Sequence, residues 1–405
     1  MTGDVLLFLE SNTTGTGRLF MRAARAEGCE PVLIARDAGL YPFAAEEGVR
    51  TVTADTGDEE SVLELCRALA PGRRLKGLTS TSDYFVAAAA RLAGRLGLPG
   101  PSAAAVDQCR DKARQHRRLR AAGVAVPDSE AAESPGEAAR AAGALGLPVV
   151  VKPVGGSGSV GVRLCATAGE AERHAALLLS RSVNERGMPV RRAVLVQRFV
   201  EGPEFSVETL AGEVIGITRK HVSDPPAFIE LGHDFPADLA DADALGAAAA
   251  ARAAVAALDL EWGAAHTELR LTADGPIIIE VNSRMAGGFI PELIRRARGI
   301  DLIRELTRRI LGREARLRPS ADGHASIRFL VPPRSGRLTA VTGGVEACAV
   351  ASVCDLSLYR PPGAEIVLAG DFHDRIGHVM AASAQAAEAR SAAERALALL
   401  TLAID

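Results

Sequence analysis

The sequence predicts an N-terminal α/β unit followed by a larger α+β body. Three observations lead to this fold class. Strand and helix patterns alternate from residue 4 to 105, which is typical of a parallel sheet with crossover helices. Antiparallel strand patterns dominate further along the chain, above all between 193 and 284. The length of 405 residues, at about 150 residues per domain, corresponds to two or three folded units.

Composition and charge exclude several classes of protein. Hydrophobic residues make up 48% of the chain and charged residues 24%, as in ordinary globular proteins. The formal net charge of −3 offers no basic surface to a phosphate backbone, so we expect no nucleic-acid partner. No apolar run approaches the roughly 20 residues of a membrane span, and the N-terminus lacks the basic region of a signal peptide. We therefore expect no membrane partner.

Cysteine usage indicates the redox environment. None of the six cysteines forms a CxxC pair, so we expect reduced thiols in a cytoplasmic protein. Cys348 and Cys354 lie in an apolar stretch and are expected in the core.

The elements of the first unit follow one another with short connections. Strands are expected at 5–10 and 31–36 and within 76–83, and helices at 18–28, 60–70 and 84–97. Asp83, in the turn after the third strand, is expected to cap the following helix. The loop Ser11–Gly17 lies where open α/β sheets place ligands, although a plain turn with a helix cap would look the same. The segment LPGPS at 98–102 carries two prolines and predicts a domain boundary.

The body begins with a basic helix, expected over residues 103–123. An extended piece from Pro127 and a strand–turn–strand at 147–165 follow. The remaining expected elements are strands within 193–222, a helix at about 242–258, a hairpin at 263–284 and a final Ala-rich helix at 382–400. We expect domains at 1–102, 103–195 and 196–405.

A glycine-rich loop, Gly156-Ser157-Gly158-Ser159-Val160-Gly161, spells GxGxxG. A dinucleotide fingerprint requires a helix to begin at the glycines, but the residues that follow alternate like a strand. Backbone N–H groups of such a hairpin can still cradle phosphate oxygens. Lys152, at the end of the preceding strand, can meet the same phosphates. The alternative is an ordinary flexible turn beside a surface lysine.

Two glutamates flank the turn of the hairpin at 263–284. If the loop is centred on Asp274, Glu268 and Glu280 lie directly opposite each other, and Asn282 shares the face of Glu280. Facing like charges are destabilising unless a cation lies between them, and hard oxygen ligands suit Mg²⁺. A two-residue Asp-Gly loop would shift the register by one residue and move Glu280 off this face. The other alternative is a solvated hairpin with salt-bridged glutamates.

Four segments together resemble the ATP-grasp superfamily, in that family's order. They are the helix with Lys112, VKPVGGSGSVGV, LVQRFVEGPEFSVE, and HTELRLTADGPIIIEVNSR. The resemblance covers most of the chain. It implies an ATP-grasp fold, with a Rossmann-like α/β domain (1–102), a small lid domain carrying the glycine-rich loop (103–195) and a larger antiparallel-sheet catalytic domain (196–405).

The resemblance also implies roles for individual residues. Lys112, Lys152, Gly156, Ser157, Gly158 and Ser159 would bind the phosphates of ATP. Gln197, Phe199 and Val200 would hold adenine, mainly through backbone groups, and Glu204 would hold the ribose. Glu268, Glu280 and Asn282 would bind Mg²⁺, with Mn²⁺ as an alternative, and Arg284 would stabilise the reacting phosphates.

Within the superfamily, FIELGHDFPADL, HTE and HASIRFLVPPRSGRL are most similar to the L-amino-acid ligases that make dipeptides. This similarity implies an ATP-dependent ligase that joins a carboxylic or amino acid to an amino acid through an acyl phosphate, releasing ADP and phosphate. Glu230 and His233 would face the substrates. The alternative for His233 is a polar turn with a solvated imidazole. Arg328 is either a substrate anchor or, as we favour, a surface charge.

Two other function classes remain. One is a carboxylase of the same superfamily that acts through carboxyphosphate, and the other is a non-catalytic nucleotide-binding module. The intact set Glu268, Glu280, Asn282 and Arg284 argues against the module. The expected partners are small-molecule carboxylates and amines, and a homodimer is the default assembly.

Overall fold

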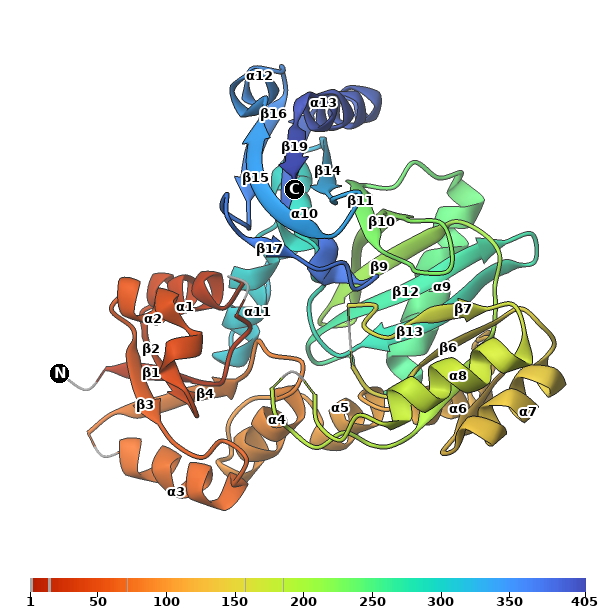
Figure 1. Ribbon diagram of the computed structural model, residues 1–405. Coiled ribbons are helices and arrows are strands. Elements are labelled where there is room, and N and C mark those ends of the chain that lie inside the picture. Colours follow the sequence, from red (N-terminus) through yellow and green to blue (C-terminus); the bar gives the residue numbers. More distant parts are fainter. Residues whose placement is uncertain (1–2, 14–15, 71, 157, 185) are drawn as a thin grey trace.

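The computed structural model describes residues 3–13, 16–70, 72–156, 158–184 and 186–405, and four β-sheets organise these residues. Figure 1 shows the N-terminal unit on the left, the region of the glycine-rich loop at the lower right, and the C-terminal elements at the top. The expected combination of an α/β unit with a larger α+β body is confirmed. Among the described residues, no helix combines the length and apolar character needed to cross a bilayer.

The N-terminal unit is a parallel sheet with strand order β3-β2-β1-β4. Its central strand is buried along VLLFL, as expected for a parallel strand covered on both faces. Its elements are β1 (Asp4–Leu9), α1 (Thr16–Ala26), β2 (Cys29–Ala35), η1 (Ala38–Leu40), α2 (Pro42–Glu46), β3 (Arg50–Thr53), α3 (Glu59–Leu69), β4 (Arg74–Thr79) and α4 (Val86–Arg95).

The single helix expected over 103–123 is two helices, α5 (Ala103–Cys109) and α6 (Lys112–Ala121). The chain breaks between them because the carboxylate of Asp111 accepts from the N–H of Arg114 at 3.0 Å and caps α6. The break places Lys112 at the first position of α6, where its side chain is buried.

The second sheet carries the glycine-rich loop and has the order β5-β8-β6-β7. Its elements are β5 (Ser129–Ala132), α7 (Pro135–Leu145), β6 (Val149–Pro153), β7 (Arg163–Cys165), α8 (Ala168–Leu179) and β8 (Val194–Arg198). Both helices begin with a Ser/Thr-x-x-Glu pattern, in which Ser134 and Thr167 accept from the N–H of Glu137 and Glu170. Strand β8 continues this sheet to Arg198, past the boundary expected at residue 195.

The largest sheet has the order β13-β12-β9-β10-β11-β14-β18-β16. Its strands and attached helices are β9 (Glu204–Leu210), β10 (Glu213–Val222), β11 (Glu230–Phe235), α9 (Asp241–Ala257), β12 (Ala264–Thr272), β13 (Gly275–Asn282), α10 (Ile290–Arg298), α11 (Leu302–Ile310), β14 (His324–Leu330), β16 (Val353–Leu358) and β18 (Gly377–Ser383). A smaller sheet, β17-β15-β19, completes the C-terminal part. The elements there are β15 (Gly336–Thr342), α12 (Gly344–Cys348), β17 (Glu365–Ile366), η2 (Phe372–Asp374), α13 (Ala386–Leu399) and β19 (Thr401–Ile404).

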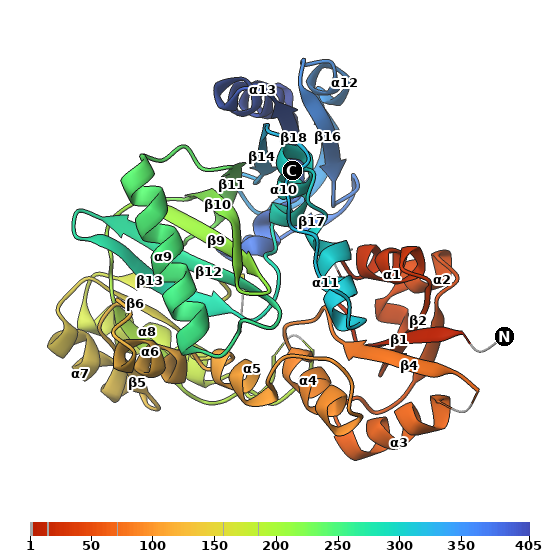
Figure 2. The same cartoon turned by 180° about the vertical axis from the view of Figure 1, so that it is seen from behind.

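One hydrophobic core joins the N-terminal unit to the body. Leu6 and Phe8 of β1 belong to the same buried cluster as Leu293 of α10 and Ile303 of α11. Figures 1 and 2 both show α11 against the N-terminal unit. At Gly77 of β4, a Cβ would lie 2.6 Å from a methyl carbon of Ile310, so the sheet and α11 are in direct contact. The N-terminal unit is therefore held rigidly beside the largest sheet.

The cysteines are free, and four of the six are buried. Cys348 and Cys354 are exposed, so their expected place in the core is wrong. Cys354 is the extra residue of a bulge in β16, between the pairs Val353–Ala381 and Asp355–Met380, at the edge of the largest sheet.

Candidate active site

Nearly all residues predicted to act in catalysis or binding line one cavity between the second and the largest sheet. Those that line it are Lys112, Lys152, Gly156, Gly158, Ser159, Gln197, Phe199, Val200, Glu204, Glu230, Glu268, Glu280, Asn282 and Arg284. Ser157 lies outside the described residues. His233 does not line the cavity and lies behind Glu230.

The hairpin β12–β13 sets the two central carboxylates opposite each other. Glu268 pairs with Glu280 and His266 with Asn282, as predicted. The predicted reason is wrong, because Thr272 pairs with Gly275 and the turn therefore has two residues. A bulge at Ile279 adds one residue to β13 and restores the pairing of the glutamates.

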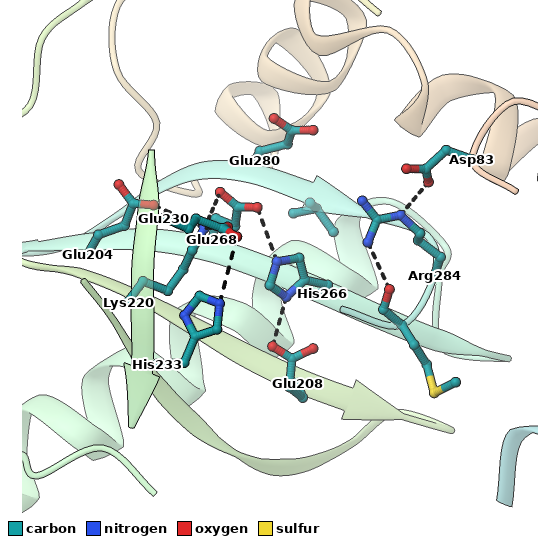
Figure 3. Close-up of polar contacts among 12 residues, drawn as sticks. Asp83, Glu204, Glu208, Lys220, Glu230, His233, His266, Glu268, Glu280 and Arg284 are labelled. Atoms are coloured by element: carbon teal, nitrogen blue, oxygen red, sulfur yellow. Dashed lines mark hydrogen bonds and ion pairs between the residues drawn. The ribbon is translucent and has the colours of Figure 1, made fainter. Parts of the chain in front are cut away.

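A buried lysine that the sequence did not single out lies among three carboxylates. The Nζ of Lys220, on β10, is 3.1 Å from an oxygen of each of Glu204, Glu230 and Glu268. Burial alone would lower the pKa of Lys220, but these carboxylates outweigh it and raise the pKa well above its usual value. Figure 3 shows Lys220 reaching into the group of glutamates.

Lysine is rare in this chain, and this rarity could have drawn attention to Lys220. The chain has four lysines among its 47 basic residues, at positions 76, 112, 152 and 220. Lys112 and Lys152 were already candidates, and the rarity of lysine was a reason to consider Lys220 as well.

Glu280 has its own cation, because the Nζ of Lys112 lies 3.1 Å from Glu280 Oε1. The same ammonium donates to the C=O of Gly156 at 2.8 Å, so it links the glycine-rich loop to the hairpin. Lys152 is buried nearby. Burial lowers its pKa to about 8, although the negative charge of Glu280 acts to raise it. The cavity thus gathers cations beside a loop of backbone amides, as phosphate binding requires.

His266 links Glu268 to a deeper carboxylate. Its Nδ1 lies 2.7 Å from Glu208 Oε1 and its Nε2 3.1 Å from Glu268 Oε1 (Figure 3). Burial alone would lower the pKa of His266, but the two carboxylates raise it to about 9. Burial alone would raise the pKa of Glu268, but the positive charges of Lys220 and His266 hold that pKa well below its usual range. Glu268 therefore carries a negative charge at neutral pH.

The glycine-rich loop has backbone conformations that favour glycine. Gly156, Gly158 and Gly161 have φ values of +106°, +68° and +72°. A Cβ at Gly158 would lie 2.5 Å from Cδ1 of Phe372, whose N–H donates to the C=O of Gly158 at 3.4 Å. The C-terminal part of the chain therefore contacts the loop directly.

The segment predicted to hold adenine is partly engaged with protein atoms. The N–H of Phe199 donates to Pro148 at 3.2 Å, and the C=O of Val200 accepts from Arg270 at 2.8 Å. The guanidinium of Arg270 also lies 5.1 Å from the ring centroid of Phe199 and pairs with Glu204 at 3.1 Å. Arg270 was not among the residues predicted from the sequence. It lies two residues after Glu268 on β12, so the two side chains share a face of the strand.

His233 lies within β11, not in a solvated turn, so that alternative is wrong. The side chain is fully buried, with its ring against Phe329 at a centroid distance of 5.6 Å. Among the described residues neither ring nitrogen has a hydrogen-bond partner, and Nε2 lies 3.7 Å from Glu230 Oε2. Burial is the main reason that the pKa of His233 falls to about 3. Arg375, which no local pattern indicated, donates to Glu230 at 2.8 Å.

Two further expectations change. The N-cap of α4 is Phe85 and not Asp83, and the carboxylate of Asp83 accepts from the guanidinium of Arg284. Arg328 is buried and pairs with Asp234 at 2.8 Å and with Glu394 at 2.9 Å, so it is not a surface charge.

The oxygen donors of the hairpin fit a magnesium ion. Within the described residues there is no cluster of three or more His, Cys, Asp or Glu that could enclose a metal by itself. Two carboxylates and an amide oxygen, from Glu268, Glu280 and Asn282, border the same cavity as the glycine-rich loop. Mg²⁺ is commonly held by one or two carboxylates together with water and substrate phosphates, and the same donors suit Mn²⁺.

Three stretches of the chain match family models. Residues 21–100 match an ATP-grasp N-terminal domain, 145–292 an ATP-grasp domain, and 328–405 the L-amino acid ligase C-terminal domain 2. The chain is 36% identical to the uncharacterized protein y4rH of Sinorhizobium fredii, over 96% of this chain and 81% of that protein. It is 32% identical to carnosine synthase 1 of Gallus gallus over 74% of this chain, but it spans only 34% of that protein.

The fold also matches a solved structure. The crystal structure of an L-amino acid ligase from Bacillus licheniformis superposes with a TM-score of 0.82 at 22% identity, covering 100% of both chains. The chain belongs to the ATP-grasp family. The match of residues 328–405 to the L-amino acid ligase C-terminal domain 2 places the chain with the ligases of this family.

Proposed function

We propose that the chain is an ADP-forming carboxylate–amine ligase. It would join a carboxylic or amino acid to an amino acid through an acyl phosphate. The observation that carries this proposal is the pairing of Glu268 with Glu280 in a cavity that also contains Lys112, Lys152 and Arg284. These are the charges that ATP and a transferring phosphoryl group require.

A carboxylate is a poor acyl donor, and transfer of the γ-phosphoryl group of ATP would activate it. An oxygen of the acid attacks the γ-phosphorus of ATP, the bond to the β-phosphate oxygen breaks, and ADP leaves. The amine then attacks the carbonyl carbon of the acyl phosphate, inorganic phosphate leaves, and the nitrogen gives up a proton. Mg²⁺, when bound by Glu268, Glu280 and Asn282, would neutralise phosphate charge.

The remaining residues would bind, orient and exclude water. Lys112 and Lys152 would hold the phosphates, and Arg284 would stabilise the charge that develops during transfer. The glycine-rich loop would keep water from the acyl phosphate. Glu230 would face the amine, and His233, a neutral side chain with Nε2 3.7 Å from Glu230 Oε2, lies behind that carboxylate. We also propose that the protein is a homodimer in the cytoplasm.

The match over residues 328–405 to the L-amino acid ligase C-terminal domain supports a ligase over a carboxylase. The test is release of ADP and phosphate from Mg·ATP across pairs drawn from a panel of carboxylic and amino acids, with mass spectrometry of the products. We expect turnover only when both an acid and an amine are present, together with an amide product. Turnover with bicarbonate alone would indicate the carboxylase, and nucleotide binding without turnover would indicate the non-catalytic module.

A further inference from the structure

An acidic side chain from the N-terminal unit holds the guanidinium of Arg284. Asp83 lies between β4 and α4, whereas Arg284 follows β13, 201 positions later in the chain. The Nε of Arg284 donates to Asp83, and its Nη1 donates to the C=O of Met285 at 2.8 Å. Figure 3 shows these two contacts on different edges of the guanidinium. The side chains of Arg284 and Asp83 are 22% and 13% exposed, so the pair is largely shielded from water.

The turn that carries Asp83 is itself fixed. The C=O of Ser82 accepts from the N–H of Phe85 at 2.9 Å, and Ser80 Oγ accepts from the N–H of Ser82 at 3.1 Å. The hydroxyls of Thr81 and Ser11 are 2.8 Å apart, which ties the turn to the end of β1. The carboxylate of Asp83 therefore stands on a rigid part of the N-terminal sheet.

The two partners belong to one packed body, since the core that contains β1 also contains α10 and α11. Arg284 lines the cavity just after the end of β13, and Figure 3 shows Asp83 beside its guanidinium. The other charged groups near this pair are Arg110, whose Nη1 lies 3.8 Å from Asp83, and the carboxylates Glu268 and Glu280, which act on Arg284 at longer range.

We infer that Asp83 is a positioning residue that acts through Arg284. Its carboxylate and the Met285 carbonyl take two of the five guanidinium N–H donors and fix the plane of the group. Arg284 is then oriented toward the cavity before any substrate enters, and a donor set in place beforehand needs no reorganisation when phosphoryl charge develops. The inference rests on the proposed function, because it takes Arg284 to act on the reacting phosphates.

A double-mutant cycle on the full chain tests the inference. We expect D83A to lower kcat by about 10- to 100-fold, with the KM for ATP changed less than about 3-fold. R284A should lower kcat further, and D83A/R284A should match R284A alone, because Asp83 has nothing left to orient. D83E should recover part of the loss. D55N, which breaks the exposed Arg36–Asp55 pair of the same unit, should behave like the wild type.

The outcomes separate the inference from the proposed function. A wild type without turnover on any acid–amine pair contradicts the proposed function. An active wild type with an unchanged D83A, or losses that multiply in the double variant, overturns the inference alone. A readout independent of activity is ¹⁵N NMR of the Arg284 Nε–H, assigned by its absence in R284K. We expect slow exchange of this proton with solvent in the wild type and fast exchange in D83A or D83N. Fast exchange in the wild type would also overturn the inference.

Discussion

Glu268 and Glu280 lie directly opposite each other on β12 and β13, although the turn that joins these strands contains two residues. The register next to the turn, in which Leu269 pairs with Ile278, would by itself place Ile279 opposite Glu268. The bulge at Ile279 shifts the register by one residue, so that Glu280 lies opposite Glu268 instead. Lys220 pairs with Glu268 and Lys112 with Glu280, each at 3.1 Å, and these cations neutralise the two carboxylates. The two lysines thus offset the repulsion between the facing carboxylates, which under the proposed function would share a cation.

The first prediction concerns this pair. E268Q and E280Q keep the size of each side chain and remove its charge, so each should lower the rate of Mg·ATP turnover by about 100-fold or more. The measurement is phosphate release as a function of Mg²⁺ concentration. D274N, at the exposed tip of the same hairpin, is the matched control and should leave the rate unchanged. Wild-type Mg²⁺ dependence in E280Q would argue against a metal role for this residue.

The second prediction concerns Lys220. K220M removes the cation that three carboxylates share, and breaking a buried charge pair in this way typically costs about 3–5 kcal/mol of unfolding free energy. We expect that loss in denaturant titrations without metal. Millimolar Mg²⁺ should restore part of the stability of K220M, because a second cation can then occupy the same group of carboxylates. K76M alters a lysine on β4 of the N-terminal unit and should show neither effect. An equal loss in both variants would contradict the prediction.

The third prediction concerns the glycine-rich loop. G158A adds a Cβ at a φ of +68° and 2.5 Å from Phe372, so the loop should shift away from its position over the cavity. We expect the KM for ATP to rise about 10-fold. The double variant G158A/F372A should recover part of the loss, because the clash is gone and only the backbone strain remains. G155A is the control, since a Cβ there meets nothing closer than 3.7 Å. Equal KM values for G155A and G158A would contradict the role of Phe372.

Local patterns predicted the parts of the site that lie on single elements. The strand alternation of HTELR and IIIEVN placed Glu268, Glu280 and Asn282 on one face, and the structure agrees. Residues joined only by tertiary packing were not predictable in this way. Arg375 meets Glu230 across 145 positions, and Asp83 meets Arg284 across 201. The alternative of a polar turn at His233 is wrong, and the sequence left it open because a buried polar residue in a strand resembles a loop residue until its neighbours are known.

A fourth prediction concerns His116 and the pH dependence of stability. His116 on α6 is buried, with Nε2 3.0 Å from the C=O of Ile279 and Nδ1 3.0 Å from Ser129 Oγ. A carbonyl can only accept, so Nε2 carries the proton and Nδ1 accepts from the hydroxyl. A second proton on Nδ1 would reverse that contact, with the Ser129 hydroxyl accepting, and would place a positive charge in a buried site. Burial is the main reason that the pKa of His116 falls to about 3, and the charge of Lys152 adds to it.

The sign of the effect follows from the two states. The unfolded chain binds a proton at His116 below a pH of about 6.5, whereas the folded chain does so only near pH 3. This residue therefore makes the free energy of unfolding fall as the pH drops from about 6.5 toward 3, with a maximum slope of about 1.4 kcal/mol per pH unit. Denaturant titrations between pH 7.5 and 4.5 measure the slope. H116Q should be less stable at pH 7.5 and should lose the slope of one proton, whereas H373Q, at an exposed imidazole, should keep the wild-type slope. An H116Q slope equal to that of the wild type would show that His116 is not held neutral in the fold.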